Sequence, residues 1–328
     1  MFFLGVDVGG TKTAAVIADE TGRVLSLKIG KGSNYQGCGI EASYKRGNET
    51  IEGACKEAGI EKNDIENAFF GIAGVDLDYD IEIIKGILKR IGIKQYAFEN
   101  DGLIALRSGT DDGKGILITC GTGSISFANN GEKIIRKGGF STFFGERLGA
   151  RHIASLSASA MVRAKDGRGP KTLMNNILED QYNITVEEMI KKDIPDLLYN
   201  GPEPIVTLIN VVYKGAQQND YVAFKILIEI VGEIINICQS IRVNMIFNPP
   251  IPLVLEGTVF KRAAPILFDL IRSALGKEYK INIPSHDPVT GAVLFAFENA
   301  GVKVTKTIQD NLFKSYDEKK AQLNSMVS

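Results

Sequence analysis

One pattern of apolar runs and glycine turns occurs twice in this chain, and it restricts the fold more than any other feature. In the first copy, the runs lie at 2–8, 13–18 and 24–29, separated by turns at 9–12 and 21–22. About 110 residues later the order returns, with runs at 115–120, 125–128 and 132–136 around turns at 121–124 and 130–131. Apolar runs bounded by Gly, Asn and Thr indicate strands joined by tight turns. The sequence therefore predicts two copies of one three-stranded unit, at a spacing natural for duplicated domains and too long for a solenoid.

Strand and helix patterns alternate after each copy of this unit, which indicates the α/β class. After the first copy we expect helices at 40–59 and 81–91 and strands at 68–73 and 95–99. After the second, the chain is mainly helical over 146–244 and then has a strand at 252–255 and helices at 262–275 and from 288. We expect domains at 1–113 and 114–328, the second enlarged by a helical insertion. The charged tail after Lys306 reads as a surface helix, and the C-terminal helix is expected to pack back on the first domain.

Charge and residue counts exclude several classes of function. The 38 Lys and Arg residues balance 39 Asp and Glu residues, which argues against nucleic acid as a partner. There are two histidines, and the four cysteines are far apart, so no zinc-binding pattern can be written. Scattered cysteines favour reduced thiols and a cytoplasmic location. No signal peptide is expected at the N-terminus, and the apolar run at 221–241 carries charges, so no membrane partner is expected either.

The glycine turns that follow the first strand of each copy have the composition of phosphate-binding loops. Asp7 ends a buried strand and is followed by Gly9, Gly10, Thr11 and Lys12. Glycines and a hydroxyl let backbone N–H groups approach an anion, and the carboxylate suits a Mg²⁺ ion held with a phosphate chain. A tight hairpin turn capped by its own Asp is the alternative. Because the second turn, 121–124, offers the same groups, we favour two turns that face one another across a cleft and hold one polyphosphate.

Carboxylate and amide side chains also follow a strand between the two turns. Asn100 and Asp101 come at the end of the strand expected at 95–99, just before a helix. They read either as a helix N-cap or as a base at the mouth of a cleft, since open α/β sheets bind ligands at the carboxyl ends of their strands. The glycines of Gly71–Gly74 end another strand, where they either form a turn or let a substrate pass close.

These motifs occur in the order seen in a known superfamily. The ordered set is Asp7–Thr13, Gly71–Gly74, Asn100-Asp101, Gly121–Ser124, Gly138-Gly139-Phe140 with Gly145-Glu146, and Glu256-Gly257-Thr258. It resembles the sugar kinase/actin/Hsp70 ATPase superfamily, and most closely its BadF/BadG/BcrA/BcrD-type branch, which includes N-acetylglucosamine kinases. The resemblance covers nearly the whole chain. It implies two duplicated ribonuclease-H-like domains flanking a cleft, and an ATP-dependent kinase that acts on a small-molecule sugar as a homodimer.

The resemblance also implies a role for each matching residue. Asp7 would organise Mg²⁺, and Asp101 would be the general base that takes a proton from the sugar hydroxyl. The expected ATP-binding residues are Gly9, Gly10, Thr11, Lys12, Thr122, Gly123, Gly257 and Thr258. The expected sugar-binding residues are Asn34, Asn100, Asp101, Gly139, Phe140 and Glu146.

The chain departs from the family pattern on the sugar side. Related N-acetylglucosamine kinases usually carry a Trp where this chain has Phe140, and an Asp where it has Glu146 followed by Arg147. Ile125 stands where a polar residue often contacts the sugar. N-acetylglucosamine phosphorylated on O6 is the first expectation, and glucose, glucosamine and N-acetylmuramic acid are the alternatives.

Two other kinds of protein fit the same superfamily. One is the ATPase activator of a 2-hydroxyacyl-CoA dehydratase or benzoyl-CoA reductase, which bridges an iron–sulfur cluster through closely placed cysteines. None of the cysteines here, which are Cys38, Cys55, Cys120 and Cys238, has that context. The other is a sugar sensor without catalysis, and the presence of Asp7 and Asp101 argues against it.

Overall fold

The computed structural model describes residues 1–75, 78–191 and 202–327. The chain forms two compact units: unit 1 is Met1–Lys114 together with Pro284–Ser328, and unit 2 is Gly115–Ile283. The first boundary lies one residue from the expected position. The second expected domain, 114–328, is shorter in the structure because residues 284–328 belong to unit 1.

Unit 1 is built on a five-stranded mixed sheet with the strand order β3-β2-β1-β4-β5. Its strands are β1 (Phe2–Val8), β2 (Lys12–Asp19), β3 (Val24–Lys31), β4 (Ile65–Ile72) and β5 (Tyr96–Asn100). The hairpin-connected strands β1, β2 and β3 pair antiparallel, whereas β4 runs parallel to both β1 and β5. The three-stranded pattern that opens the sequence therefore supplies three of the five strands of this sheet.

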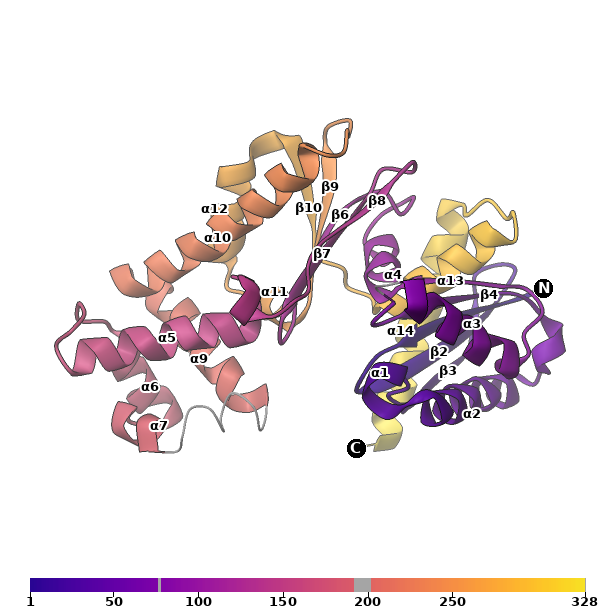
Figure 1. Ribbon diagram of the computed structural model, residues 1–328, viewed down its shortest axis with the longest axis horizontal. Coiled ribbons are helices and arrows are strands. Elements are labelled where there is room, and N and C mark those ends of the chain that lie inside the picture. The colour runs from indigo at the N-terminus through magenta and orange to yellow at the C-terminus, as the bar shows by residue number, and fades with distance from the viewer. Residues whose placement is uncertain (76–77, 192–201, 328) are drawn as a thin grey trace. The chain divides into compact units, whose positions relative to one another are not determined.

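Helices cover both faces of this sheet, which explains why β1 is an almost continuous apolar run. The helices of unit 1 are α1 (Tyr35–Cys38), α2 (Ile40–Ala58), α3 (Asp78–Ile91), α4 (Asp101–Ser108), α13 (Pro288–Asn299) and α14 (Lys306–Val327). Leu4 and Val6 pack with α2 and α3, while Phe3 packs with α4, α13 and α14. Alternate residues of one strand thus enter two separate cores. Figure 1 shows α13 and α14, in yellow, beside the dark N-terminal strands.

The C-terminal helix differs from the surface helix that its charge pattern predicts. Leu312 and Tyr316 of α14 are buried in the same core as Phe3 and Val16. Ser315 Oγ accepts a hydrogen bond from the Val24 amide at 2.8 Å, and Asn311 donates to the Thr21 carbonyl at 2.9 Å. A narrow apolar face among many charges was enough to fix this helix on the sheet.

Unit 2 repeats the topology, with the strand order β10-β9-β6-β7-β8. Its strands are β6 (Gly115–Cys120), β7 (Ser124–Asn129), β8 (Ile134–Gly138), β9 (Ile251–Glu256) and β10 (Tyr279–Asn282). As in unit 1, the first three pair antiparallel and β6, β9 and β10 are parallel. The sequence analysis missed β10, which is four residues long, contains Lys280 and follows Lys277 and Glu278. The order of the five strands is that of unit 1, so the predicted duplication extends to the whole sheet.

The additional length of unit 2 is helical. Its helices are α5 (Ala150–Lys165), α6 (Met174–Tyr182), α7 (Val186–Lys191), α9 (Pro202–Gln217), α10 (Tyr221–Arg242), α11 (Thr258–Lys261) and α12 (Pro265–Leu275). The helix expected at 262–275 begins three residues later, at Pro265, and the separate short helix α11 precedes it. Apolar residues of α5, α9, α10 and α12 form a single core with the sheet.

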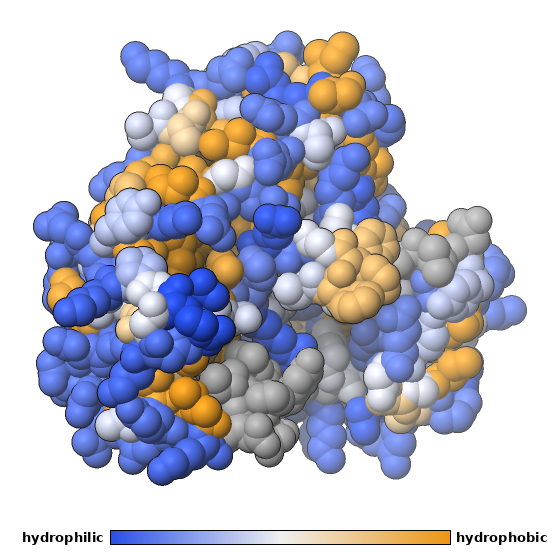
Figure 2. Space-filling model, turned by 60° about the vertical axis from the view of Figure 1, so that its left-hand side comes forward, coloured by the Kyte–Doolittle hydropathy of each residue, from blue (hydrophilic) through white to orange (hydrophobic). Residues whose placement is uncertain are grey.

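No helix within residues 1–75, 78–191 and 202–327 is long and apolar enough to cross a membrane. In the view of Figure 2 the surface is mostly hydrophilic, and the hydrophobic residues lie in separate groups.

Candidate functional site

The glycine turn of unit 1 connects β1 to β2 at the carboxyl end of β1. The Gly9 amide donates to the Lys12 carbonyl at 3.0 Å, which closes the turn. The loop after β3 holds it from outside: the Gly32 amide donates to the Thr11 carbonyl at 3.1 Å, and the Asn34 amide to the Gly9 carbonyl at 3.3 Å. A Cβ on Gly10 would meet no atom within 4 Å, so the space around Gly10 is open. The turn is both a braced hairpin and a surface that an anion can approach.

The strand register places Asp7 and Asp101 at one edge of the sheet in unit 1. Asp7 pairs with Gly71 of β4, and Gly71 pairs with Glu99 of β5. Asp101 follows two residues later, as the first residue of α4. Since neighbouring strands lie about 4.8 Å apart, β1 and β5 are about 10 Å apart at this edge. That separation leaves room for a small group between the two carboxylates.

Asn100 and Asp101 show how the two interpretations of this segment combine. Asn100 is buried and caps α4, since its side-chain oxygen accepts a hydrogen bond from the Gly102 amide at 2.9 Å. Asp101 is partly exposed beside it. Because Asn100 supplies the cap, the carboxylate of Asp101 is not needed for that purpose. The N-cap alternative therefore applies to Asn100.

The glycines of Gly71–Gly74 serve packing. A Cβ on Gly71 would lie 2.2 Å from Ile104 of α4, so the absence of a side chain lets α4 approach the sheet. Gly74 has a φ of +82° and lies against Gln36, which donates to the Gly74 carbonyl at 2.9 Å.

The Asn34 loop is held by side chains on both sides. The Asn34 side chain caps α1 by accepting from the Gln36 amide at 2.9 Å. Tyr35 donates to buried Asp80, and burial together with this bond raises the pKa of Tyr35 to about 12. Asn34 is thereby fixed next to the glycine turn, where its backbone amide donates to the Gly9 carbonyl.

The residues of this edge fit a Mg²⁺ ion. Asp7 supplies the carboxylate oxygens that Mg²⁺ prefers, and the open space at Gly10 admits the phosphates and waters that complete its octahedral shell. No group of three or more His, Cys, Asp or Glu side chains with metal-binding geometry occurs in the described part of the chain. Asp7 would therefore share the ion with the substrate's phosphates.

The glycine turn of unit 2 is braced differently. The amides of Ala150 and Arg151, at the start of α5, donate to the carbonyls of Gly121 and Thr122 at 2.8 and 3.3 Å. Those two donors are used within the protein. Thr122 and Gly123 are themselves exposed. The Thr122 hydroxyl and the amides of Thr122 and Gly123 therefore remain available to a phosphate.

The Gly257-Thr258 turn follows β9 beside this second glycine turn. Gly257 has a φ of +106°, and a Cβ there would lie 2.5 Å from the Cys120 carbonyl oxygen. Glycine is therefore required for the chain to pass the end of β6. Exposed Thr258 begins α11.

A carboxylate in front of this turn was not assigned a role from the sequence. Glu256 accepts from Lys261 at 2.7 Å through Oε1, whereas its Oε2 is buried with no hydrogen-bond partner within residues 1–75, 78–191 and 202–327. Such an oxygen is an acceptor that a hydroxyl of a bound ligand can satisfy.

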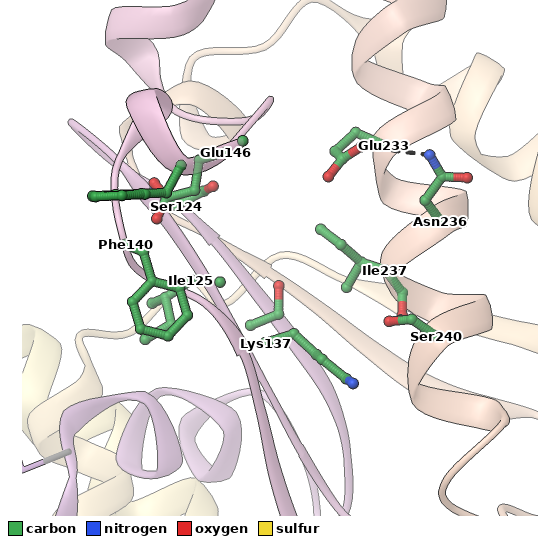
Figure 3. A pocket seen from close by; sticks show the side chains of 13 residues that line it. Ser124, Ile125, Lys137, Phe140, Glu146, Glu233, Asn236, Ile237 and Ser240 are labelled. Carbon is green, nitrogen blue, oxygen red and sulfur yellow. Dashed lines mark hydrogen bonds between the residues drawn. The ribbon is translucent and has the colours of Figure 1, made fainter. Parts of the chain in front are cut away.

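Two of the expected sugar-side residues of unit 2, Phe140 and Glu146, line a pocket of about 370 Å³, and Gly139 is adjacent to Phe140 in the chain. Figure 3 shows its two walls: Phe140, Ile125, Ser124 and Glu146 lie on one side, and Glu233, Asn236, Ile237 and Ser240 of α10 on the other. Lys137 of β8 lies between them, and no hydrogen bond or ion pair of its side chain is found among the described residues. The mixture of apolar and polar groups is typical of a site for a small polar molecule.

Glu146 holds the loop that carries Phe140. Its Oε1 accepts from the Ser141 amide at 2.7 Å, and its Oε2 accepts from the Ser124 amide at 3.4 Å. One carboxylate thus connects the Phe140 loop to the end of the second glycine turn. Phe140 itself is 64% exposed, and Gly139 next to it has a φ of +86°.

The α10 wall is the part of the pocket that sequence reasoning missed. Glu233, Asn236 and Ser240 lie three or four residues apart and therefore on one face of the helix. This polar stripe inside an apolar helix was the available signal. Its meaning depended on which element packs opposite, and the sequence does not give that.

Other reactive side chains have structural roles. Buried Ser157 donates to the Leu208 carbonyl at 3.0 Å, which ties α5 to α9. Cys55, Cys120 and Cys238 are buried, and burial raises the pKa of the Cys120 and Cys238 thiols to about 12. These thiols pack as apolar groups.

The chain is similar to known proteins over nearly its whole length. The family model of the BadF/BadG/BcrA/BcrD ATPase family matches residues 4–296. The N-acetyl-D-glucosamine kinase of Dictyostelium discoideum is 28% identical over 314 residues, which cover 90% of this chain and 98% of that protein. The N-acetylmuramic acid/N-acetylglucosamine kinase of Clostridium acetobutylicum is 27% identical over 305 residues, with the same two coverages.

A solved structure confirms the expected fold. The crystal structure of a candidate N-acetylglucosamine kinase from Chromobacterium violaceum has a TM-score of 0.67 to this chain at 21% identity. The match covers 90% of this chain and 98% of that chain. The α/β fold is thus of the two-domain ribonuclease-H-like type, as the order of the sequence motifs implied.

Proposed function

Because the chain belongs to the BadF/BadG/BcrA/BcrD ATPase family, and because its full-length relatives are sugar kinases, we propose that it is an ATP-dependent carbohydrate kinase acting on N-acetylglucosamine. The observation that carries this proposal is the register row Asp7–Gly71–Glu99, which brings Asp7 and Asp101 to one sheet edge beside an open glycine turn. A phosphate-side carboxylate and a second carboxylate about two strands away are what transfer to a hydroxyl requires.

We propose the following division of work for the transfer. Asp101 accepts the proton of the sugar hydroxyl, O6 in our proposal, as that oxygen forms a bond to the γ-phosphorus and the bond from phosphorus to the β–γ bridging oxygen breaks. ADP leaves with the bridging oxygen's electron pair. Gly9, Gly10, Thr11, Lys12, Thr122 and Gly123 surround the phosphates, which the amides of Gly10, Thr11, Thr122 and Gly123, the threonine hydroxyls and the Lys12 ammonium group bind. Gly257 and Thr258 lie on the adenosine side. Mg²⁺ at Asp7 would supply charge neutralisation, and positioning accounts for most of the remaining catalysis.

We propose that the pocket of unit 2 holds part of the sugar. Phe140 offers an apolar ring, and Glu233 and Asn236 offer an acceptor and donors for hydroxyl and acetamido groups. Both oxygens of Glu146 are occupied by the Ser141 and Ser124 amides, so Glu146 acts on the sugar either by shaping this loop or by exchanging one amide for a sugar hydroxyl. Asn34 and Asn100 of unit 1, and Gly139 beside Phe140, complete the proposed sugar set.

The deciding experiment measures ADP release in a coupled assay across N-acetylglucosamine, glucose, glucosamine and N-acetylmuramic acid. We expect the highest kcat/KM for N-acetylglucosamine. D101N should lower kcat by about 10²–10⁴-fold while ATP binding, measured by calorimetry, is retained. D111N, at an exposed position just after α4, is the matched control and should be as active as the wild type. Full activity of D101N would refute the role of Asp101, and no turnover with any sugar would refute the kinase assignment.

Three further properties belong to this proposal. We propose that the protein is a homodimer and that it works in the cytoplasm with Mg²⁺. Light scattering measures the first, and titration of Mg²⁺ into the coupled assay measures the third.

A further inference from the structure

The C-terminal helix α14 lies beyond residues 4–296, the part of the chain that the family model matches. It is nevertheless part of the core of unit 1, because Tyr316 is 2% exposed and Leu312 is fully buried. Because α14 is packed in this core, the polar side chains on its inner face are held at fixed positions relative to the sheet of unit 1.

Two side chains of α14 meet a carboxylate that the proposed reaction does not use. This carboxylate is that of Asp287, the N-cap residue of α13. Its Oδ2 accepts a hydrogen bond from the Tyr316 hydroxyl at 2.5 Å and forms an ion pair with Lys320 Nζ at 2.8 Å. Lys320 is 39% exposed and Asp287 24% exposed, so the pair is partly shielded from water.

This cluster lies at the end of α13 that faces the first glycine turn. Phe297 of α13 stacks on Phe3, and a Cβ on Gly5 would lie 2.9 Å from the Val289 carbonyl oxygen, so α13 begins toward the end of β1 that leads into the turn. Burial tends to raise the pKa of Asp287, but the bonds from Lys320 and Tyr316 and the charges of Lys320 and Lys12 outweigh it and hold the pKa below its ordinary value. The charge of Asp7 acts on Tyr316 in turn, whose pKa is raised by burial first and by Asp287 and Asp7 as well. Asp7, Lys12, Asp287 and Lys320 thus form one electrostatic group in unit 1. The neighbouring His286 pairs with Asp317 at 3.3 Å and stacks on Phe313.

We propose that Lys320 and Tyr316 are positioning residues for the ATP phosphates, because they occupy the Asp287 carboxylate and so leave the Lys12 ammonium available to phosphate oxygens. The inference rests on the proposed function. Lys12 is exposed, and no hydrogen bond or ion pair of its side chain is found among the described residues. Without Lys320, Lys12 is the other cation whose charge acts on the Asp287 carboxylate, and that carboxylate also repels the incoming phosphates.

The experiment compares K320M with K319M, which removes the same charge from the adjacent position of α14. Lys319 pairs loosely with Glu57 at 3.8 Å and belongs to no part of the proposed site. We expect K320M to raise the KM for ATP about tenfold, with kcat within about threefold and the KM for sugar unchanged, since charge-assisted contacts to phosphate contribute roughly this much to binding. K319M should match the wild type.

The double variant D287N/K320M separates a charge effect from a loss of packing. If Lys320 acts by neutralising Asp287, removal of both charges restores the KM for ATP toward the wild-type value. K320R, which keeps the charge, should also remain close to the wild type. Melting temperatures of all variants, followed by circular dichroism, show whether unit 1 is folded.

The outcomes distinguish this inference from the proposed function. A wild-type protein that phosphorylates no sugar refutes the kinase assignment. A wild-type kinase in which K320M and K319M have equal KM values for ATP refutes only the inference, and so does a double variant that binds ATP as poorly as K320M. If K320M does not fold, the comparison of D287N/K320M with K320R decides, because a defective but folded double variant contradicts the charge mechanism.

Discussion

The two glycine turns lie at the same place in two sheets of the same strand order, yet their surroundings differ. In unit 1, Asp7 precedes the turn, and in unit 2, Thr119 occupies the matching position. The Thr119 hydroxyl donates to the Ile125 carbonyl at 3.0 Å and accepts from the Ile125 amide at 3.3 Å, so it is tied to its own sheet. The position of the turn and its length of three residues are the same in both copies, whereas the carboxylate is present in one copy only.

The braces of the turns differ as well. A loop holds the first turn through the amides of Gly32 and Asn34, and the start of a helix holds the second through Ala150 and Arg151. The loop of unit 1 also carries the proposed sugar ligand Asn34, and Glu146 connects the turn of unit 2 to the Phe140 loop. In both units, the brace of the glycine turn is continuous with residues that we propose bind the sugar. The following predictions test this comparison.

The largest expected effect is on kcat/KM, which should fall far more on substitution of Asp7 than on substitution of Thr119. D7N should reduce kcat/KM about 100-fold or more, because a carboxylate that holds a divalent ion on the phosphates is lost. T119V, at the matching position of unit 2, removes two hydrogen bonds inside the protein and should change kcat/KM by less than about fivefold. The coupled ADP assay at saturating Mg²⁺ measures both. Equal losses would mean that the two turns play equivalent parts.

The second prediction concerns the core of unit 1, which both ends of the chain build. Fully buried Arg107 of α4 bonds Glu298 of α13 at 2.8 Å and the Thr110 carbonyl at 2.7 Å. R107M leaves Glu298 without its partner and should lower the free energy of unfolding by about 3 kcal/mol.

The matched control is R90M, which breaks the exposed Arg90–Glu41 pair in the same unit. It should cost less than about 1 kcal/mol. Urea unfolding gives the change in the free energy of unfolding for each variant, and peptide-resolved hydrogen exchange shows which segments of the chain are destabilised. Faster exchange spread evenly over unit 2 as well would contradict a core that belongs to unit 1.

A third, smaller effect is expected from matched glycine variants of the two turns. Cβ atoms on Gly10 and Gly121 would each meet no atom within 4 Å, so G10A and G121A should keep the wild-type melting temperature. We expect the KM for ATP to rise by up to about tenfold in both, because a methyl group intrudes where the phosphates approach. G257A is the contrast: its φ of +106° and the nearby Cys120 carbonyl should lower the melting temperature. Lower stability of G10A would show that the space at Gly10 is needed for packing.

The smallest effect is on acid stability. The pKa of Asp287 is below its ordinary value of 3.8 when the protein is folded, for the reasons given above. A carboxyl with a lowered pKa stabilises the fold at pH values above its unfolded pKa, and this contribution is lost as the pH falls through the lower, folded pKa. Below pH 3.8, the urea midpoint of the wild type should therefore fall more steeply than that of D287N. Parallel slopes would contradict this contribution.

The sequence predicted the architecture well because the relevant signals are local. Strand boundaries follow from short apolar runs between glycine turns, and β1 and β6 begin and end at the predicted residues. It also placed Asn100 at the end of a strand before a helix, as β5 and α4 show. The strand at 279–282 was missed because its local signal is weak: it has only four residues, and one of them is Lys280.

What the tertiary structure decided concerns contacts between distant residues. The sequence led us to expect only the C-terminal helix on the first unit. That α13 also belongs there depends on its packing against β1, for which the chain carries no local pattern. The pairing of Lys320 with Asp287 beside Lys12 and the α10 wall opposite Phe140 likewise depend on which faces meet. The sequence by itself determined the elements, the duplication and the acidic and glycine residues of the site. The fold decided their partners, because burial and charge pairing depend on neighbours in space.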